Sequence, residues 1–236
     1  MFEFFHRAKH WLLFIPISAV TIYQYGLQIA YQDNLTTWQV EMQDPDADFD
    51  AMMPNMADFD SYFYFFVLLF LISYGTHFLW YWSVGKGLHH YVPEGTALKP
   101  QRFKIAMIVN AVMLFVGAYF FVEAWGFFGD FFSSLSGDAS DDGSMAEEEY
   151  LQQILTGVGV MFLLFFFWLI AMVYSCYYVG KTLKSIELGR PARGGEVAGY
   201  ALLSYLLLIG IWMLQPKVNR LVSTGSMTNA EESSTW

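Results

Sequence analysis

Cysteine and charge are the two things that this sequence has least of. The chain has one cysteine, Cys176, so it can form neither an intrachain disulfide nor a zinc site built on cysteines. Charged residues make up 14% of the chain, and Lys and Arg together number only 12. The absence of a dense basic stretch excludes the electrostatic surface that nucleic acid requires, so we expect no nucleic-acid partner.

The sequence also lacks the short motifs of the common enzyme classes. It contains no G-x-S-x-G, H-E-x-x-H, P-loop or G-x-G-x-x-G pattern. Five histidines are too few for a membrane di-iron enzyme, and a b-type haem would need a second intramembrane histidine opposite His77. We therefore predict that the protein is not an enzyme and holds no intrinsic cofactor of this kind.

What the chain has in abundance is long apolar segments. Hydrophobic residues make up 56% of it and aromatic residues 19%, and residues 61–84 contain no charge at all. A run of about 20 such residues crosses a hydrocarbon core about 30 Å thick as a helix. The sequence predicts an all-α polytopic integral membrane helical bundle in contact with lipids. Its spans are expected at residues 11–30, 61–84, 105–128 and 154–179, with a short fifth at 198–214.

Flanking segments divide the rest of the chain by charge. Residues 1–10 form a short amphipathic lead, residues 33–60 and 129–150 form two acidic loops, and residues 215–236 form a polar tail. All 12 Lys and Arg lie before the first span, between the second and third, between the fourth and fifth, or after the fifth. The positive-inside rule therefore predicts a cytoplasmic N-terminus and two outer acidic loops, in a plasma or bacterial inner membrane.

The fifth apolar segment, residues 198–214, is difficult to reconcile with the positive-inside rule. Its seventeen residues would rise about 25 Å as a helix, and a full crossing would carry Lys217 and Arg220 to the outside. A re-entrant or tilted segment would keep both residues inside. Because the segment is apolar nearly all round, unlike a helix that lies in the interface, the sequence favours a short crossing that ends at Gln215.

The second acidic loop has the spacing of a calcium loop. Asp138, Ser140, Asp142 and Glu149 fall at positions one, three, five and twelve of a twelve-residue frame, with Gly143 at position six. This pattern resembles a single EF-hand loop, and the resemblance implies Ca²⁺ as a ligand. An acidic loop of this composition also reaches the pattern by chance, and no second EF-hand loop accompanies it. A solvated acidic loop is the preferred interpretation, and calcium binding is the alternative.

Five polar residues lie inside the predicted spans: Gln24, Gln28, His77, Asn110 and Glu123. An ionisable group at membrane depth is a candidate for an ion or proton path, whereas amides and histidines more often hydrogen-bond between helices. Trp80, Tyr81 and Trp82, near the end of the second span, suit the headgroup level.

Two function classes are compatible with this pattern. The preferred one is a non-catalytic subunit or interaction component of a membrane assembly, whose acidic outer loops bind a cation or a basic partner. The alternative is a small channel or secondary transporter, in which the five intramembrane polar residues line a path between helices.

A short sequence also recurs. Val-Gly-Lys-x-Leu occurs at residues 84–88 and again at 179–183, each time followed by a basic loop and another apolar segment. Four matching characters are typical of two ordinary hairpins that obey the same charge rule. A parallel internal repeat, as in some transporters, is the alternative.

Overall fold

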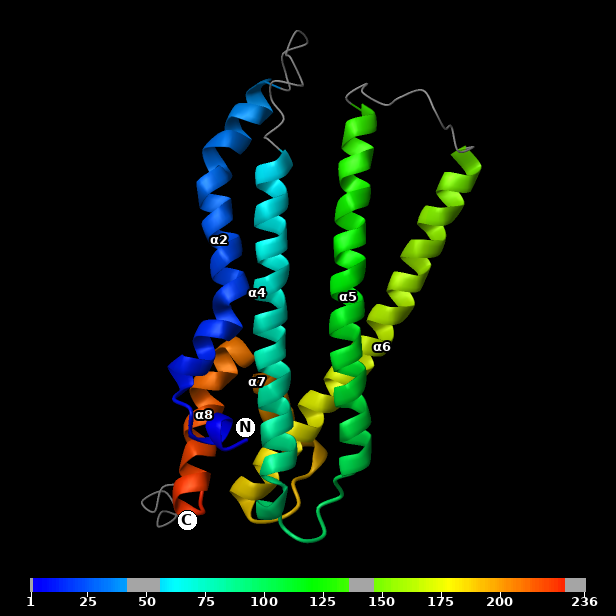
Figure 1. The fold of residues 1–236 in the computed structure, drawn as a ribbon. Helices are drawn as coiled ribbons and strands as arrows, with labels where there is room; N and C mark the ends of the chain where they lie inside the picture. Colours follow the sequence, from blue (N-terminus) through cyan, green and yellow to red (C-terminus); the bar gives the residue numbers. More distant parts are fainter. Residues whose placement is uncertain (1, 42–55, 136–146, 228–236) are drawn as a thin grey trace. The chain divides into compact units, whose positions relative to one another are not determined.

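The structure is a computed structural model, and it describes residues 2–41, 56–135 and 147–227. Every regular element in these ranges is a helix (Figure 1), so the all-helical prediction is confirmed. In chain order the elements are α1 (Phe2–Arg7), α2 (His10–Glu41), α4 (Met56–Trp82), the π-helical turn η1 (Ser83–Gly87), the 3-10 turn η2 (His89–Tyr91), α5 (Pro100–Leu135), α6 (Glu147–Leu188), α7 (Gly194–Tyr205) and α8 (Leu207–Thr224).

Four of these helices are long and apolar enough to cross a membrane. Their spanning segments are His10–Ile29, Tyr62–Tyr91, Pro100–Glu123 and Gly159–Leu188. Each overlaps one of the four predicted spans, which makes the chain a polytopic membrane protein. The second and fourth segments have 30 residues each, more than the roughly 20 that a hydrocarbon core needs.

The predicted fifth segment is not one straight helix. It forms most of α7 and the first half of α8, which are long and apolar enough to cross a membrane only as a pair and are bent by 116°. The bend lies at Leu206, whose backbone leaves the helical region with φ −84° and ψ 53°. A Cβ atom on Gly210 would lie 1.9 Å from the carbonyl oxygen of Leu203, so the second arm can begin this close to the first only with glycine there.

By its contacts the chain divides into two compact units. The first unit consists of Met1–Ser18, Ile72–Leu114 and Phe165–Trp236, and it contains all 12 Lys and Arg, so we call it the basic unit. Its largest fully buried side chains come from α2, α4, α6, α8 and the turns that follow α4: Leu13, Trp80, Tyr81, Leu88, Tyr178, Leu183, Leu207 and Ile211. Trp80 and Tyr81 are both 0% exposed in this core, so neither ring presents an edge to water, and their level in the membrane stays a prediction.

The second unit consists of Ala19–Leu71 and Phe115–Leu164. Here α2 meets α4 where the hydroxyl of Tyr23 donates to the carbonyl of Tyr62 at 3.1 Å. The helices α4 and α5 meet through aromatic rings, with Phe63 stacked on Phe121 at 5.2 Å between centroids. The described contacts between helices in this unit are therefore largely aromatic, and the one hydrogen bond named here also comes from an aromatic side chain.

The two Val-Gly-Lys-x-Leu sequences make parallel contacts within the basic unit. Both valines and both leucines are at most 1% exposed. Lys86 lies over the ring of Trp82, and Lys181 over the ring of Tyr177, in each case the residue four positions before it. Each glycine admits the next helix: a Cβ would meet Phe103 of α5 at Gly85 and the backbone of Ala201 of α7 at Gly180. The recurrence is therefore one of packing as well as of sequence.

Candidate functional site

The predicted calcium loop lies outside the described residues, apart from the backbone of α6 at Glu149. Calcium binding through Asp138, Ser140, Asp142 and Glu149 thus stays a prediction. Among the side chains that the structure does describe, no group of three or more His, Cys, Asp or Glu could hold a metal ion.

The five predicted polar-path residues fall in both units. In the second unit, Gln24 and Gln28 of α2 and Glu123 of α5 are exposed. In the basic unit, Asn110 is 0% exposed and the Nε2 atom of His77 is buried. A continuous path through all five stays a prediction, and the two residues of the basic unit can be described in detail.

Asn110 joins α5 to α6 within the basic unit. Its Nδ2 donates to the hydroxyl of Ser175 at 3.0 Å, and that hydroxyl donates to the carbonyl of Ala171 at 2.8 Å. The Oδ1 atom of Asn110 is buried and has no hydrogen-bond partner among the described residues. One half of this amide therefore acts as an interhelical link, and the other half is an unused acceptor.

His77 lies on α4 one turn before Tyr81, with ring centroids 4.6 Å apart. The Tyr81 hydroxyl donates to the carbonyl of Ser204 at 2.7 Å and lies 3.2 Å from the sulfur of Cys176. In a continuous helix the Ser204 carbonyl would accept from the amide four residues later, which the bend at Leu206 removes. Tyr81 therefore supplies the hydrogen bond that the broken helix lacks, as membrane proteins require of irregular backbone at depth.

Gln215 is the most connected polar side chain that the structure describes, and it is 0% exposed. Its Oε1 accepts from the indole N–H of Trp80 at 2.7 Å. Its Nε2 lies 2.6 Å from the carbonyl of Phe5, 3.2 Å from that of Ala8 and 2.8 Å from Oδ1 of Asn219. One amide thus joins α8 to α4 and to the α1 region.

A second contact holds α1 in place. The Nε2 of His6 lies 3.1 Å from the carbonyl of Ser83, and because a carbonyl only accepts, this nitrogen carries the proton. A Cβ on Gly87 would lie 2.5 Å from the His6 ring, so glycine there makes room for the imidazole. His6 is 8% exposed and serves as a structural donor.

Glu187, near the end of α6, forms ion pairs with two lysines of the basic unit. Its carboxylate accepts from Lys184 and Lys217 at 2.6 Å each and from the hydroxyl of Tyr200 at 2.7 Å. The ammonium of Lys217 also lies 2.7 Å from the Tyr200 hydroxyl and 5.1 Å from the ring centroid. One carboxylate therefore ties together α6, α7 and α8.

A separate pair closes the connection between α6 and α7. The guanidinium of Arg190 forms a bidentate pair with Glu196 at 2.6 and 3.2 Å, which raises the pKa of Arg190. The backbone N–H of Arg193 donates to the same carboxylate at 2.9 Å, as in a capping box. The pair fixes the start of α7.

Sequence reasoning missed Gln215, Tyr81, Ser204 and Glu187. Gln215 follows an apolar run that points to a helix end, and Glu187 lies in a basic loop where a lone carboxylate attracts little notice. The signal that could have found the network is the amide of Gln215 directly after the apolar segment, because a buried amide requires hydrogen-bond partners.

The chain matches no family model, no curated protein and no solved structure. The function is therefore inferred from the geometry alone. The network described here supplies hydrogen bonds and ion pairs that join helices.

Proposed function

We propose that this chain is a non-catalytic integral membrane protein that serves as a subunit or interaction component of a membrane assembly. The observation that carries the proposal is the exposure of α6 ahead of the basic unit's core. Of the described side chains between Thr156 and Ile170, none is buried within the chain.

That stretch covers four helical turns, about 22 Å of helix. Its exposed side chains are large and apolar, with fractional exposures of 73% for Phe162, 58% for Phe166 and 53% for Ile170. A helix that packs within its own bundle buries one stripe at helical spacing. Since this stretch buries none, its surface is open to lipid or to a helix of another chain.

The glycines at the start of the stretch support a protein partner. Gly157 and Gly159 are exposed, and a Cβ at either would meet nothing within 4 Å. Small residues on an open helix surface permit close backbone approach by a neighbouring helix, which lipid chains do not need. A transmembrane helix of another chain, either a different protein or a second copy, is the occupant that we propose.

Photo-crosslinking in the native membrane tests the proposal. Benzoyl-phenylalanine in place of Phe166 is expected to give a discrete protein adduct after illumination. Phe115 on α5 is a matched control, because it is the same residue type in another span and is 65% exposed. Adducts of lipid alone at position 166, or the same adducts at positions 166 and 115, would contradict a specific partner.

Two buried polar atoms of the basic unit favour a second candidate, a small channel or transporter. His77 Nε2 and Asn110 Oδ1 are buried without a hydrogen-bond partner in the described ranges, and such atoms line polar paths in membrane proteins. Reconstituted vesicles would show an ion or proton flux that His77→Leu and Asn110→Leu each reduce. No flux above that of empty vesicles would dismiss this candidate.

Calcium binding by residues 138–149 is a further part of the proposal. Titration of the intact protein and of a Glu149→Gln variant with Ca²⁺ separates a built site from a solvated acidic loop. Equal binding by both would leave the solvated loop as the interpretation, because the last carboxylate of such a loop is a bidentate ligand.

A further inference from the structure

The broken pair α7 and α8 raises the question of which side of the membrane its two ends occupy. Two contacts answer it within the basic unit. Lys217, ten residues into α8, lies 2.6 Å from Glu187, which precedes α7. Had the chain crossed the membrane between these residues, about 30 Å of hydrocarbon would separate them.

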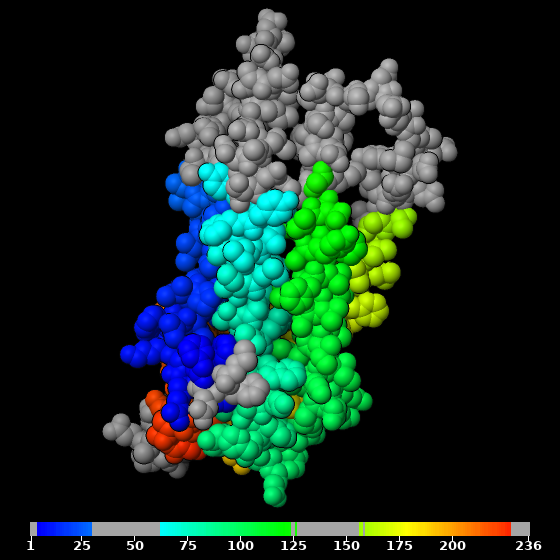
Figure 2. All heavy atoms as spheres, in the orientation of Figure 1, coloured from blue at the N-terminus to red at the C-terminus, as the bar shows by residue number. Residues whose placement is uncertain are grey.

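The second contact involves the start of the chain. Gln215 and Asn219 of α8 both bind the backbone of the α1 region, at 2.6 Å to the Phe5 carbonyl and 3.1 Å to the Ala8 carbonyl. Figure 2 shows the α8 end of the chain (red) directly beside the first residues (blue). Since α1 precedes the first span, α8 ends on the side from which that span starts.

We propose that α7 and α8 form a re-entrant hairpin, which enters the membrane from the basic side, turns at Leu206 and leaves on the same side. The partner of its tip is the acyl chains of that leaflet. The chain then has four full crossings, and the hairpin adds no fifth.

The dimensions suit a re-entrant segment and not a crossing. The arm α7 has 12 residues and rises about 18 Å, too short for a core of about 30 Å. The turn is seated against α4, where Tyr81 donates to the Ser204 carbonyl. Tyr81 is five residues before Lys86, about 8 Å along the helix. The turn therefore lies about 8 Å deeper in the membrane than Lys86.

The exposed face of α8 changes character along the helix. Near the turn, the exposed side chains are apolar, with Ile209 60%, Trp212 46% and Met213 55% exposed. The opposite face is buried and apolar, with Ile211 and Val218 at 0%. Beyond Gln215 the exposed or half-buried side chains are mostly polar: Pro216, Lys217, Asn219, Arg220, Val222, Ser223 and Thr224. The helix therefore passes from an environment without water to one with water.

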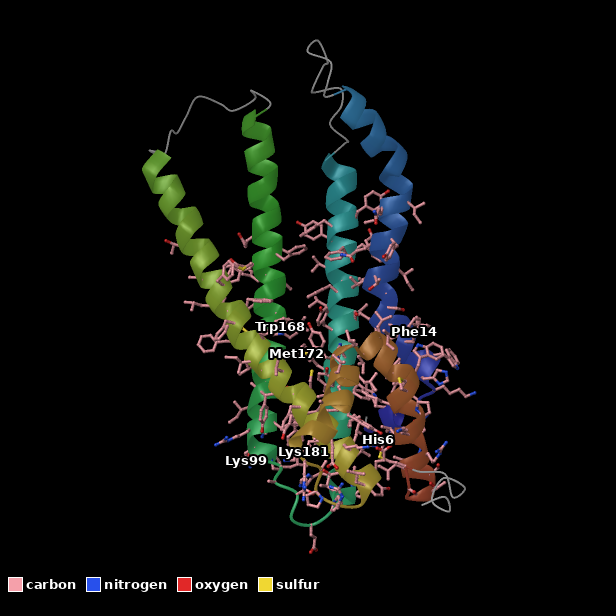
Figure 3. All side chains as sticks on the ribbon, turned by 180° about the vertical axis from the view of Figure 1, so that it is seen from behind. His6, Phe14, Lys99, Trp168, Met172 and Lys181 are labelled. Atoms are coloured by element: carbon pink, nitrogen blue, oxygen red, sulfur yellow. The ribbon has the colours of Figure 1, made fainter. Side chains whose placement is uncertain are left out.

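Trp212 marks the boundary between the two environments. Its ring lies 4.4 Å from that of His10 and 5.4 Å from that of Phe14, at the start of the first span (Figure 3 labels Phe14). An indole at the level where a span begins is typical of the membrane interface.

The sidedness is tested with cysteine variants of the full chain in sealed vesicles of known orientation. Lys9→Cys and Ser223→Cys are both at exposed positions, and Cys176 stays in place because it is 4% exposed. An impermeant maleimide is expected to label both variants from the same side, above the background of the parent chain. Labelling from opposite sides would overturn the proposal and establish a fifth crossing.

The lipid partner is tested by fluorescence quenching in vesicles that contain only the purified chain. A probe on Ile209→Cys is expected to lose fluorescence with lipids that carry a quencher on the acyl chain, whereas a probe on Ser223→Cys keeps it. A probe at position 209 that such lipids do not quench would overturn the seating of the tip in the leaflet. The two experiments are independent of any partner protein on α6.

Discussion

Replacing Gln215 with leucine removes the amide that joins α8 to α4 and to the α1 region. The indole N–H of Trp80, which is 0% exposed, then loses its acceptor at 2.7 Å, and the Phe5 carbonyl loses its donor at 2.6 Å. Leaving one buried polar group without a partner costs about 1–3 kcal/mol, so the two together lower the free energy of unfolding by about 2–6 kcal/mol. Leucine is close to glutamine in size, so little of this loss comes from a cavity.

Gln215→Glu separates hydrogen bonding from packing. A carboxylate still accepts from Trp80, but it cannot donate to the carbonyls of Phe5 and Ala8, which lie 2.6 and 3.2 Å from the amide nitrogen. We expect a loss at least as large as that of the leucine variant, because a buried charge is added.

Unfolding of the purified protein in mixed micelles, followed by tryptophan fluorescence, measures both variants. Met213→Ala is the matched control, since Met213 lies on the same helix and is 55% exposed. Its free energy of unfolding is expected to change by no more than about 0.5 kcal/mol. A Gln215→Leu variant as stable as the parent chain would refute the view that this network holds the basic unit together.

Two further predictions concern the hairpin and its base. Gly210→Ala places a Cβ 1.9 Å from the Leu203 carbonyl oxygen, and we expect unfolding at lower denaturant by at least the ~1–3 kcal/mol typical of overpacking. Gly199→Ala, where a Cβ meets nothing within 4 Å, is expected to be neutral or stabilising in the same measurement. Glu187→Gln removes the charge that faces Lys217 at 2.6 Å, and should lower the free energy of unfolding by about 1–3 kcal/mol at low salt. At high salt the variant and the parent chain are expected to differ less in this free energy, and a loss that is independent of salt would speak against an ion-pair role.

The spans could be predicted because they depend on composition over long windows. An 18-residue window within Gly159–Leu188 has a mean hydropathy of 2.2, and no soluble arrangement accounts for so long an apolar surface. The segregation of Lys and Arg into the basic unit followed from the same reading, since charge is counted along the chain without knowledge of contacts.

The polar network could not be predicted because it depends on pairs far apart in sequence. Trp80 and Gln215 are 135 residues apart, and Gln215 and Phe5 are 210 apart. The sequence predicted the headgroup level for Trp80 because an indole is amphipathic, but it gave no protein partner for the indole N–H. Here the indole N–H finds Gln215, which permits complete burial.

The fifth segment shows how a packing constraint decides what composition leaves open. Both copies of Val-Gly-Lys-x-Leu lead through a basic loop into a helix, yet α5 continues for 36 residues while α7 ends after 12. The second copy can break because Gly210 lets α8 begin against Leu203, and because Tyr81 satisfies the carbonyl that the break sets free. With this glycine and this hydrogen bond, an apolar segment can turn back within the membrane. Hydropathy records such a run as a short span, whereas the hydrogen bonds of Glu187 and Gln215 bring its end back to the basic side.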